Sequence, residues 1–558
     1  MSQTKIMLAK SGLGRVFLHL GCICRGGKWS FHWAGVRRQF NPTNNRSSRA
    51  LCWLVFALCL AVSPMLRADV IPSPLFTDNA VLQRDTKLPV WGKADAGERV
   101  TISFAGQTRE VIANGQGEWE TKLAPMKANV RGTLTIRGKN FVTLTNLVMG
   151  DVWLCSGQSN MGLKVREVTN ALAEIAAANL PDIRQFYVPN HPSAAPEPDT
   201  FVKSSWQPAS PKTVGEFTAA GFFFAREIHA TLGVPIGIIN SSWGGTLIQP
   251  WMSLEVLKKY PGYEKLLARK QAEFAAWPAR KQQIEADLKT WETNAALAKA
   301  ANKPVPDKPW NPGPPDSGCR MPGQLYNGMI HPLIQYRIKG ALWYQGEANA
   351  SGGAGGAADY TDLLSRLIAS WRKDFGGSDF PFYFVQLPNW DNPDDKSKMS
   401  WAFFREGQAN VLKVPNTGMA VTIDIGDSGN IHPKNKQEAG RRLALVALAN
   451  TYGQKNIFSG PVMSGSTVEG DAIRVRFDHV EHGLVAHGDA LTGFEIAASD
   501  GKFNPANVTI ENDSVLVSNP EIRAPKFVRY GWANNPPVNF FNDAGLPAAP
   551  FRTDKFAN

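Results

Sequence analysis

A serine follows an apolar segment in residues 150–161, which read Gly-Asp-Val-Trp-Leu-Cys-Ser-Gly-Gln-Ser-Asn-Met. The apolar residues predict a buried strand, and the Ser-Gly-Gln after them predicts a turn into a helix near Ser159. Ligands of open α/β sheets bind at the carboxyl ends of strands, and the N–H groups of a starting helix stabilise negative charge. Ser159 therefore stands where a nucleophilic hydroxyl is needed, although the same spacing suits a serine that only caps a helix.

A histidine is the second candidate for chemistry. His432 lies in a glycine-rich loop between a predicted strand at 419–424 and a predicted helix at 436–452. Its place after a strand matches that of Ser159, and imidazole is the side chain best suited to take a hydroxyl proton near neutral pH. A single loop histidine is otherwise most often just exposed to solvent.

Three features argue against other hydrolase chemistries. Met161 stands where the G-x-S-x-G turn of ordinary α/β-hydrolases has its second glycine, which disfavours that class. Gly426-Asp427-Ser428 spells a Gly-Asp-Ser motif, but Ser428 lies only four residues from His432. Cys155 is inside the predicted strand, so a buried structural thiol is favoured over a cysteine nucleophile.

The pattern of apolar residues predicts the elements that position these side chains. Alternation with turn residues between the runs predicts a small antiparallel β-sandwich over residues 70–147. From residue 149, short apolar runs alternate with helical stretches, which predicts a parallel sheet covered on both faces. Residues 254–303 predict an amphipathic helical insertion, closed by a proline-rich segment at 304–315. Alternation returns from about residue 460 and predicts a C-terminal β-rich region.

The charge is concentrated in the first 68 of the 558 residues. The formal charge of +12 includes ten basic and no acidic residues there, which leaves 50 basic and 48 acidic residues in the remainder. That balance disfavours nucleic-acid binding. The apolar run at 50–62 follows Arg46 and Arg49 and precedes Ala68, which is typical of a secretory signal peptide. Thirteen residues are few for a membrane of about 30 Å, so an uncleaved anchor is the weaker alternative.

We therefore expect a secreted or periplasmic protein with no membrane contact after signal cleavage. Four of its six cysteines leave with the leader. The other two, Cys155 and Cys319, form either one bridge or two separate buried thiols.

The sequence predicts neither a metal site nor a bound cofactor. His479, His482 and His487 lie close together, but a solvated loop explains them better than a zinc site does. There is no P-loop, and no G-x-G-x-x-G follows a predicted strand.

Four ordered blocks resemble the sialate O-acetylesterase family, a branch of the SGNH (GDSL-like) hydrolases. The first is residues 150–161. The others are Asn240-Ser241-Ser242-Trp243-Gly244-Gly245-Thr246 with Pro250-Trp251, Trp343-Tyr344-Gln345-Gly346-Glu347-Ala348-Asn349, and Asn430-Ile431-His432-Pro433-Lys434-Asn435-Lys436. Similar segments at 81–84, 320–330 and 545–553 extend the resemblance over nearly all of residues 70–555.

The resemblance implies a fold and a division of the chain. The fold class is α/β: a three-layer α/β/α hydrolase domain of the SGNH type, with flanking β-rich domains and a helical insertion. The expected parts are a leader with the signal peptide (1–68), an N-terminal β-sandwich-like domain (69–147), the first half of the hydrolase (148–253), the helical insertion and proline-rich linker (254–318), the second half (319–459) and a C-terminal β-rich region (460–558).

The resemblance also implies roles for single residues. Ser159 matches the nucleophile, and His432 matches the general base. The oxyanion hole would combine the Ser159 N–H, a backbone N–H from Gly244 or Gly245, and a side-chain amide from Gln345 or Asn349.

The acid of the site is less defined. SGNH enzymes usually have Asp three residues before the histidine, but Gly429 stands there. Asp427 is the preferred candidate, while Asp424 or a backbone carbonyl could orient the imidazole instead.

The implied activity is a serine esterase that hydrolyses O-acetyl esters on sialic acid or related glycans through an acetyl-enzyme intermediate, with no cofactor. Its partner is an acetylated sugar or polysaccharide. Acetylated xylan or another polysaccharide is the alternative substrate, and a non-catalytic polysaccharide-binding protein is the alternative function. The aromatic residues Trp243, Trp251, Tyr326 and Trp343 lie near the blocks and could form a sugar platform or pack in the core.

Overall fold

The computed structural model of the chain describes residues 22–25, 28–31, 69–200, 204–309, 311–377 and 379–556. The chain divides into two units, Met1–Ala68 and Asp69–Asn558. In the first unit, β1 (Cys22–Arg25) pairs antiparallel with β2 (Lys28–Phe31). The predicted signal peptide, with its apolar run at 50–62 and Ala68, lies outside the described residues. Among the described helices, none combines the length and the apolar character that a membrane crossing requires.

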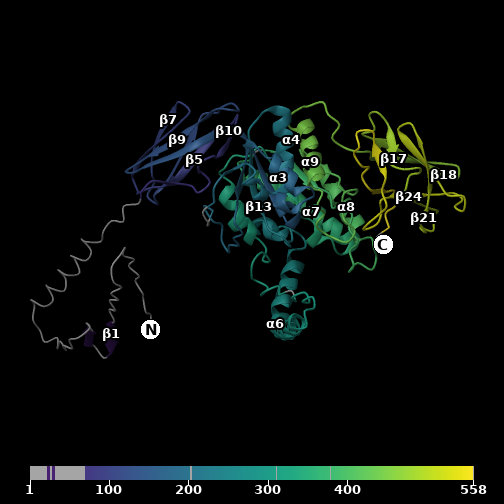
Figure 1. Ribbon diagram of the computed structural model, residues 1–558, viewed down its shortest axis with the longest axis horizontal. Coiled ribbons are helices and arrows are strands. Elements are labelled where there is room, and N and C mark those ends of the chain that lie inside the picture. The colour runs from purple at the N-terminus through teal and green to yellow at the C-terminus, as the bar shows by residue number, and fades with distance from the viewer. Residues whose placement is uncertain are drawn as a thin grey trace, which may run out of the picture. The chain divides into compact units, whose positions relative to one another are not determined.

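A sheet with the strand order β12-β11-β13-β10-β14-β15-β16 forms the centre of the second unit (Figure 1). Its neighbouring strands run parallel, except that β12 is antiparallel to β11. The bounds are β10 (Phe141–Gly157), β11 (Leu180–Tyr187), β12 (Gln207–Ala209), β13 (Ile236–Ser242), β14 (Gly340–Tyr344), β15 (Phe382–Val385) and β16 (Thr417–Ala420). The sheet confirms the expected α/β class.

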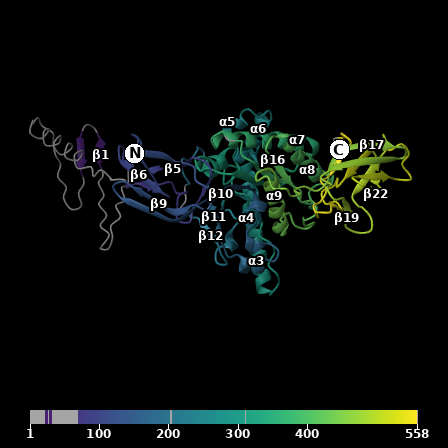
Figure 2. The same ribbon diagram turned by 90° about the horizontal axis from the view of Figure 1, so that it is seen from above.

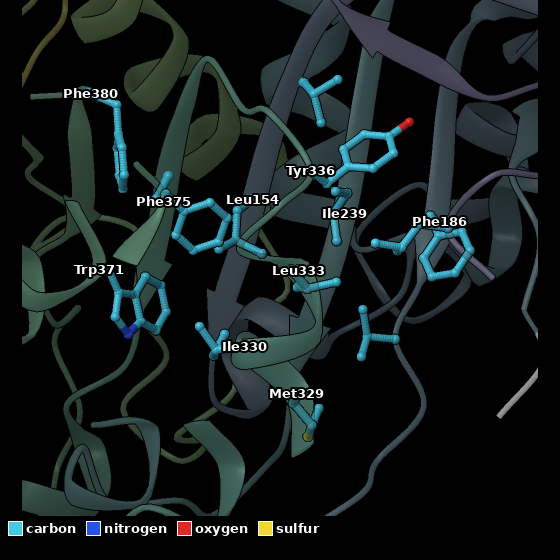
Figure 3. Close-up of a cluster of buried hydrophobic side chains, with 14 of the residues drawn as sticks. Leu154, Phe186, Ile239, Met329, Ile330, Leu333, Tyr336, Trp371, Phe375 and Phe380 are labelled. Atoms are coloured by element: carbon cyan, nitrogen blue, oxygen red, sulfur yellow. The ribbon is translucent and has the colours of Figure 1, made fainter. Parts of the chain in front are cut away.

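Both faces of this sheet are buried, as the continuous apolar runs of its strands require. Successive residues of a strand point to opposite faces, so Leu154 packs in one cluster while Trp153 and Cys155 pack in another. The first cluster includes Ile239 of the sheet and Trp371 of a covering helix, which Figure 3 shows together. The three-layer arrangement follows from this division.

Helices α4 and α9 cover one face of the sheet, while α7 and the segment 325–336 cover the other. The α-helices are α2 (Ser159–Gly162), α3 (Ala171–Ala177), α4 (Ala219–Leu232), α5 (Leu254–Leu257), α6 (Tyr263–Ala300), α7 (Gly353–Asp374), α8 (Ser400–Asn410) and α9 (Lys436–Asn450). The short helical turns are η1 (Val165–Glu167), η2 (Val214–Glu216), η3 (Gln249–Trp251), η4 (Tyr326–Ile330), η5 (His331–Leu333), η6 (Glu347–Asn349) and η7 (Val411–Lys413).

The N-terminal strands form two sheets, and one of them shares β10 with the central sheet. The first half of β10 pairs with β9 and β4, and the second half pairs with β13 and β14. The predicted boundary at 147/148 thus falls inside one strand. The other strands here are β3 (Ile71–Pro72), β4 (Val81–Gln83), β5 (Leu88–Lys93), β6 (Arg99–Phe104), β7 (Gln107–Ile112), β8 (Glu118–Leu123) and β9 (Arg131–Arg137).

The insertion after β13 is dominated by α6, which extends away from the sheet in Figure 1. Ile284, Leu288 and Trp291, the apolar residues of the predicted helix face, are partly buried. The Trp291 Nε1–H donates to the Pro306 carbonyl at 2.7 Å, so the proline-rich segment runs back beside the helix.

The C-terminal region consists of short antiparallel strands, seen with their labels in Figure 2. Its core includes Val475, Ile496, Val517 and Tyr530. The strands are β17 (Val462–Glu469), β18 (Ala472–Asp478), β19 (Leu484–Ala486), β20 (Phe494–Ala497), β21 (Asn504–Pro505), β22 (Asn507–Glu511), β23 (Ser514–Ser518), β24 (Phe527–Tyr530), β25 (Phe540–Asn542) and β26 (Phe551–Arg552).

Candidate active site

Ser159 and His432 meet at the carboxyl end of the central sheet, although they lie 273 residues apart in the sequence. The His432 Nε2 atom is 2.8 Å from the Ser159 Oγ atom. A base within hydrogen-bond reach of a hydroxyl is the arrangement that activates a serine nucleophile. This contact is the centre of the candidate site.

Gly157 shapes the turn that presents the serine. Its φ of +131° is in the region that only glycine adopts readily, and a Cβ atom there would lie 2.2 Å from the Tyr344 carbonyl oxygen. The next N–H group, that of Gln158, donates to the same oxygen at 2.9 Å. Strand β10 can therefore end against β14, and the chain enters α2 with Ser159 as its first residue.

His432 is held by the loop that precedes α9. The Asn430 side-chain oxygen accepts the His432 backbone N–H at 2.9 Å, and Asn435 caps α9 by accepting the Glu438 N–H. Partial burial lowers the pKa of His432, and the positive charge of Lys436 lowers it further, while the negative charge of Glu167 opposes both. The imidazole therefore stays neutral, and able to accept a proton, at lower pH than an ordinary histidine does.

Neither candidate acid is brought to the imidazole. Asp427 is exposed, and its Oδ1 atom accepts the Gly429 N–H of its own loop at 3.0 Å. Both oxygens of Asp424 are bonded to the Arg442 guanidinium, at 2.6 and 2.8 Å. Within the described ranges, no residue forms a hydrogen bond with the His432 Nδ1 atom. The geometry is that of a Ser–His pair.

Two backbone N–H groups beside Ser159 are available to bind an oxyanion. In the part of the chain that the structure describes, the N–H groups of Ser159 and Gly244 donate no hydrogen bond. A Cβ atom on Gly244 would lie 3.2 Å from the Ser159 Cβ atom, so glycine lets this backbone approach closely. Gly245 follows with a φ of +73° and completes the turn.

The structure distinguishes the two candidate side-chain amides. Gln345 is fully buried, and its Nε2 group donates to the Thr246 carbonyl and to Asn349 Oδ1, at 3.0 and 2.8 Å. Asn349 also accepts the Ile248 N–H, so its oxygen is occupied, and its Nδ2 group has one long contact within the described ranges, to Gln249 Oε1 at 3.5 Å. Gln345 therefore orients Asn349, and Asn349 is the amide with a donor to spare.

Sequence reasoning missed a buried polar cluster behind the Ser–His pair. Asn160, the residue after Ser159, donates to Glu347 Oε1 at 2.5 Å and accepts from the Lys436 ammonium at 2.8 Å. Asn160 and Lys436 are each 0 % exposed. Burial lowers the pKa of Lys436 to about 7, against the negative charge of Glu347. All three residues belong to the four blocks. The charged residues Glu347 and Lys436 within these blocks were the signal from which the sequence could have indicated a role near the site.

The other sequence candidates lie outside this cluster. Cys155 is completely buried, burial raises the pKa of its thiol, and both it and Cys319 are free thiols. Ser428 is exposed beside Asp427. His487 stacks on Phe541 at 4.0 Å between ring centroids. Over the described residues, no group of three or more His, Cys, Asp or Glu side chains is placed to hold a metal ion.

Most of the aromatic residues proposed for a sugar platform are in the core. Trp251 and Trp343 are buried and pack edge to face at 6.1 Å. Tyr326 is buried and donates to Asp374 at 2.7 Å. Trp243, which is partly exposed and immediately precedes Gly244, is the member of the four that can reach a substrate.

Comparison with known proteins places the chain in a family. The family model described as carbohydrate esterase, sialic acid-specific acetylesterase, matches residues 149–288 and 297–449. The chain belongs to this family. It is therefore a carboxylic ester hydrolase that acts on O-acetylated sugars, as the four blocks predicted.

Similar proteins extend the match over most of the chain. The sialate O-acetylesterase of Mus musculus is 31 % identical over 524 residues, which are 85 % of this chain and 93 % of that protein. The sialate O-acetylesterase of Homo sapiens is 31 % identical over 426 residues, covering 69 % and 72 %. The crystal structure of a carbohydrate acetylesterase from Xanthomonas citri has a TM-score of 0.75 and 35 % identity, covering 88 % of this chain and 100 % of that one.

Proposed function

We propose that the protein removes O-acetyl groups from sialic acid or related glycans by a serine mechanism with an acetyl-enzyme intermediate. The observation that carries the proposal is the 2.8 Å contact between Ser159 Oγ and His432 Nε2, beside the Ser159 and Gly244 N–H groups, which have no partner among the described residues.

In the first half of the reaction, His432 Nε2 takes the Ser159 hydroxyl proton while Oγ attacks the acetyl carbonyl carbon. The resulting oxyanion is stabilised by the N–H groups of Ser159 and Gly244 and by the Asn349 amide. The C–O bond to the sugar then breaks, and the imidazolium gives its proton to the leaving sugar oxygen. Ser159 is left with the acetyl group.

In the second half, neutral His432 removes a proton from water as the water attacks the acetyl carbonyl. The same donors stabilise the second oxyanion. When the bond to Oγ breaks, the imidazolium returns its proton to Ser159, and acetic acid leaves and ionises to acetate. The cycle needs no group outside the chain and water.

The substrate is proposed from the relatives. The curated relatives from mouse and human are named sialate O-acetylesterases, which supports acetylated sialic acid as the substrate. The Xanthomonas citri relative has the higher identity, 35 %, and is named only as a carbohydrate acetylesterase. An acetylated polysaccharide such as xylan is therefore the second candidate substrate. The basic, apolar leader supports secretion or periplasmic export.

The test is acetate release from O-acetyl sialic acid and from acetylated xylan, measured side by side with the wild-type protein and two serine variants. Ser159→Ala should lose at least about 10³-fold in kcat, because the nucleophile is gone. Ser428→Ala is the matched control and should retain full activity, because the Ser428 side chain is exposed to solvent. Activity in Ser159→Ala equal to wild type would contradict the proposal and favour a non-catalytic sugar-binding role for this site.

A further inference from the structure

Lys436 and Glu347 are ionisable groups next to the active site that the proposed mechanism does not use, and burial raises the pKa of Glu347 while it lowers that of Lys436. Lys436 is 0 % exposed, and the Glu347 Oε2 atom is buried without a hydrogen bond in the described residues. Burying charged groups costs several kcal/mol unless they are paired and hydrogen-bonded. Their position at a catalytic pair therefore calls for a functional explanation.

Asn160, the neighbour of Ser159, connects Glu347 and Lys436 to the loop that carries His432. Its Nδ2 group donates to Glu347 Oε1 at 2.5 Å and to the Ile431 carbonyl at 3.0 Å, while its Oδ1 atom accepts from Lys436 Nζ at 2.8 Å. Lys436 Nζ also donates to the Pro433 carbonyl at 2.6 Å. The two carbonyls flanking His432 in the sequence are thus both fixed to one cluster, and that cluster begins at the residue after Ser159.

We propose that Lys436, held by Asn160 and Glu347, is a positioning residue that fixes the His432 loop against Ser159 and brings a cation close to the imidazole. The proposal rests on the serine mechanism above. The carbonyl contacts hold the imidazole at the distance needed for proton transfer, and small displacements at such a site reduce catalysis strongly.

The charges around the histidine support the second part of the proposal. Burial lowers the pKa of His432 most, the charge of Lys436 from α9 lowers it further, and the charge of Glu167 from η1 raises it. On the histidine's own loop, Asp427 and Lys434 are exposed, and water screens their charges.

The surroundings of Lys436 keep its charge close to the site. Glu347 from η6 opposes the loss of its proton, and the Tyr344 ring of β14 lies 5.1 Å from Nζ. A cation in this buried position acts on the imidazole with little screening. It therefore disfavours the imidazolium form, whereas a buried aspartate at Nδ1 would favour it.

The experiment is the pH dependence of kcat/KM for acetate release by the full chain and two lysine variants. Lys436→Met should lower kcat at least about tenfold, because the loop contacts are lost. It should also move the acid limb of the profile to higher pH, because the neighbouring cation is gone. Lys434→Met removes the same charge from an exposed position two residues away and should leave both quantities unchanged.

A fall in kcat with an unmoved acid limb would show that Lys436 only supports packing and would overturn the proposal, as would an unchanged Lys436→Met enzyme. Activity in Ser159→Ala, measured in the same series, would instead overturn the serine mechanism.

A second measurement needs no core variant, should Lys436→Met not fold. The acid limb of the wild-type enzyme should stay within about 0.2 unit between low and high salt, because a buried charge is poorly screened. A limb that moves toward the ordinary histidine value in high salt would assign the effect to surface charges and contradict the proposal.

Discussion

At the residue scale, the site is a serine and a histidine, and among the residues that the structure describes no carboxylate binds the imidazole. In a triad, an aspartate orients the histidine and stabilises its charged form. Here the orientation comes from backbone and amide contacts, through Asn430 and the Asn160 cluster. The neighbouring charge, that of Lys436, is positive and lowers the pKa of His432 in addition to burial. His432 is therefore neutral, and can act as a base, at lower pH than a histidine paired with an aspartate.

The pH dependence of the wild-type enzyme follows from this arrangement. The pKa of His432 is lowered in the folded protein, so the imidazole is protonated and inactive only when the pH falls below that value. We expect the acid limb of kcat/KM to have its midpoint below about 6.5, the ordinary histidine value. A profile over a wide pH range measures this directly, and a midpoint above that value would contradict the assignment of His432 as the neutral base.

Sequence reasoning at this scale found the nucleophile and base candidates but not the residues that hold them. Ser159 and His432 could be chosen because their types and their places after strands suit the chemistry. The Asn160 contacts could not be predicted, because they join residues 187 and 276 positions apart. Asp427 was preferred as the acid because it is near in sequence, but its carboxylate folds back onto its own loop.

At the element scale, β10 is the strand that both builds and presents the site. Its residues alternate in exposure from Phe141 to about Asn146 and are buried continuously from Leu147 to Gly157. The pattern changes because the first half covers one face of a sandwich, while the second half is enclosed by helices on both faces. The sequence therefore predicted two elements where there is one, although it placed the buried segment before Ser159 correctly.

Gly157→Ala tests the turn at the end of this strand. The new Cβ atom would meet the Tyr344 carbonyl at 2.2 Å, and φ would remain in the glycine region. We expect a loss of roughly 1–3 kcal/mol in the free energy of unfolding, measured by urea titration, together with lower activity. Gly115→Ala is the control, because no atom lies within 4 Å of its added Cβ. Equal urea midpoints for the two variants would show that the turn tolerates a side chain.

At the scale of the whole second unit, a buried ion pair connects the N-terminal β region to the central sheet and α9. Asp151 of β10 is 0 % exposed, and the Arg84 guanidinium, which follows β4, bonds both of its oxygens at 2.9 Å. Gln83 and the Tyr452 hydroxyl also donate to this carboxylate, each at 3.0 Å. The pair explains why β4 and β10 stay together where β10 passes between the two sheets.

Removing the arginine should destabilise the whole unit. Arg84→Met leaves a buried carboxylate without its cation, and we expect a loss of about 3 kcal/mol or more in the free energy of unfolding. Arg99→Met is the control, because the Arg99–Glu110 pair is exposed and should contribute less than about 1 kcal/mol. Denaturant unfolding of both variants decides the point, and similar losses would mean that the buried pair does not hold the two regions together.

The order of elements over residues 69–558 was largely predictable, because strand and helix periods differ and the four blocks fall at strand ends. The contacts between distant elements were not, since they depend on how the sheets pack. The ion pair of Arg84 with Asp151 is one example. Another is that Cys155 and Cys319 are both free thiols, where the sequence left a bridge between them open.

The most direct test of the account is to find the acetyl group on the enzyme. The protein is mixed with O-acetyl sialic acid, quenched in acid within the first turnovers, digested and mapped by mass spectrometry. The account predicts one added acetyl group on the peptide that contains Ser159, and none in Ser159→Ala. An acetyl group on another residue, or turnover by the Ser159→Ala enzyme, would contradict it.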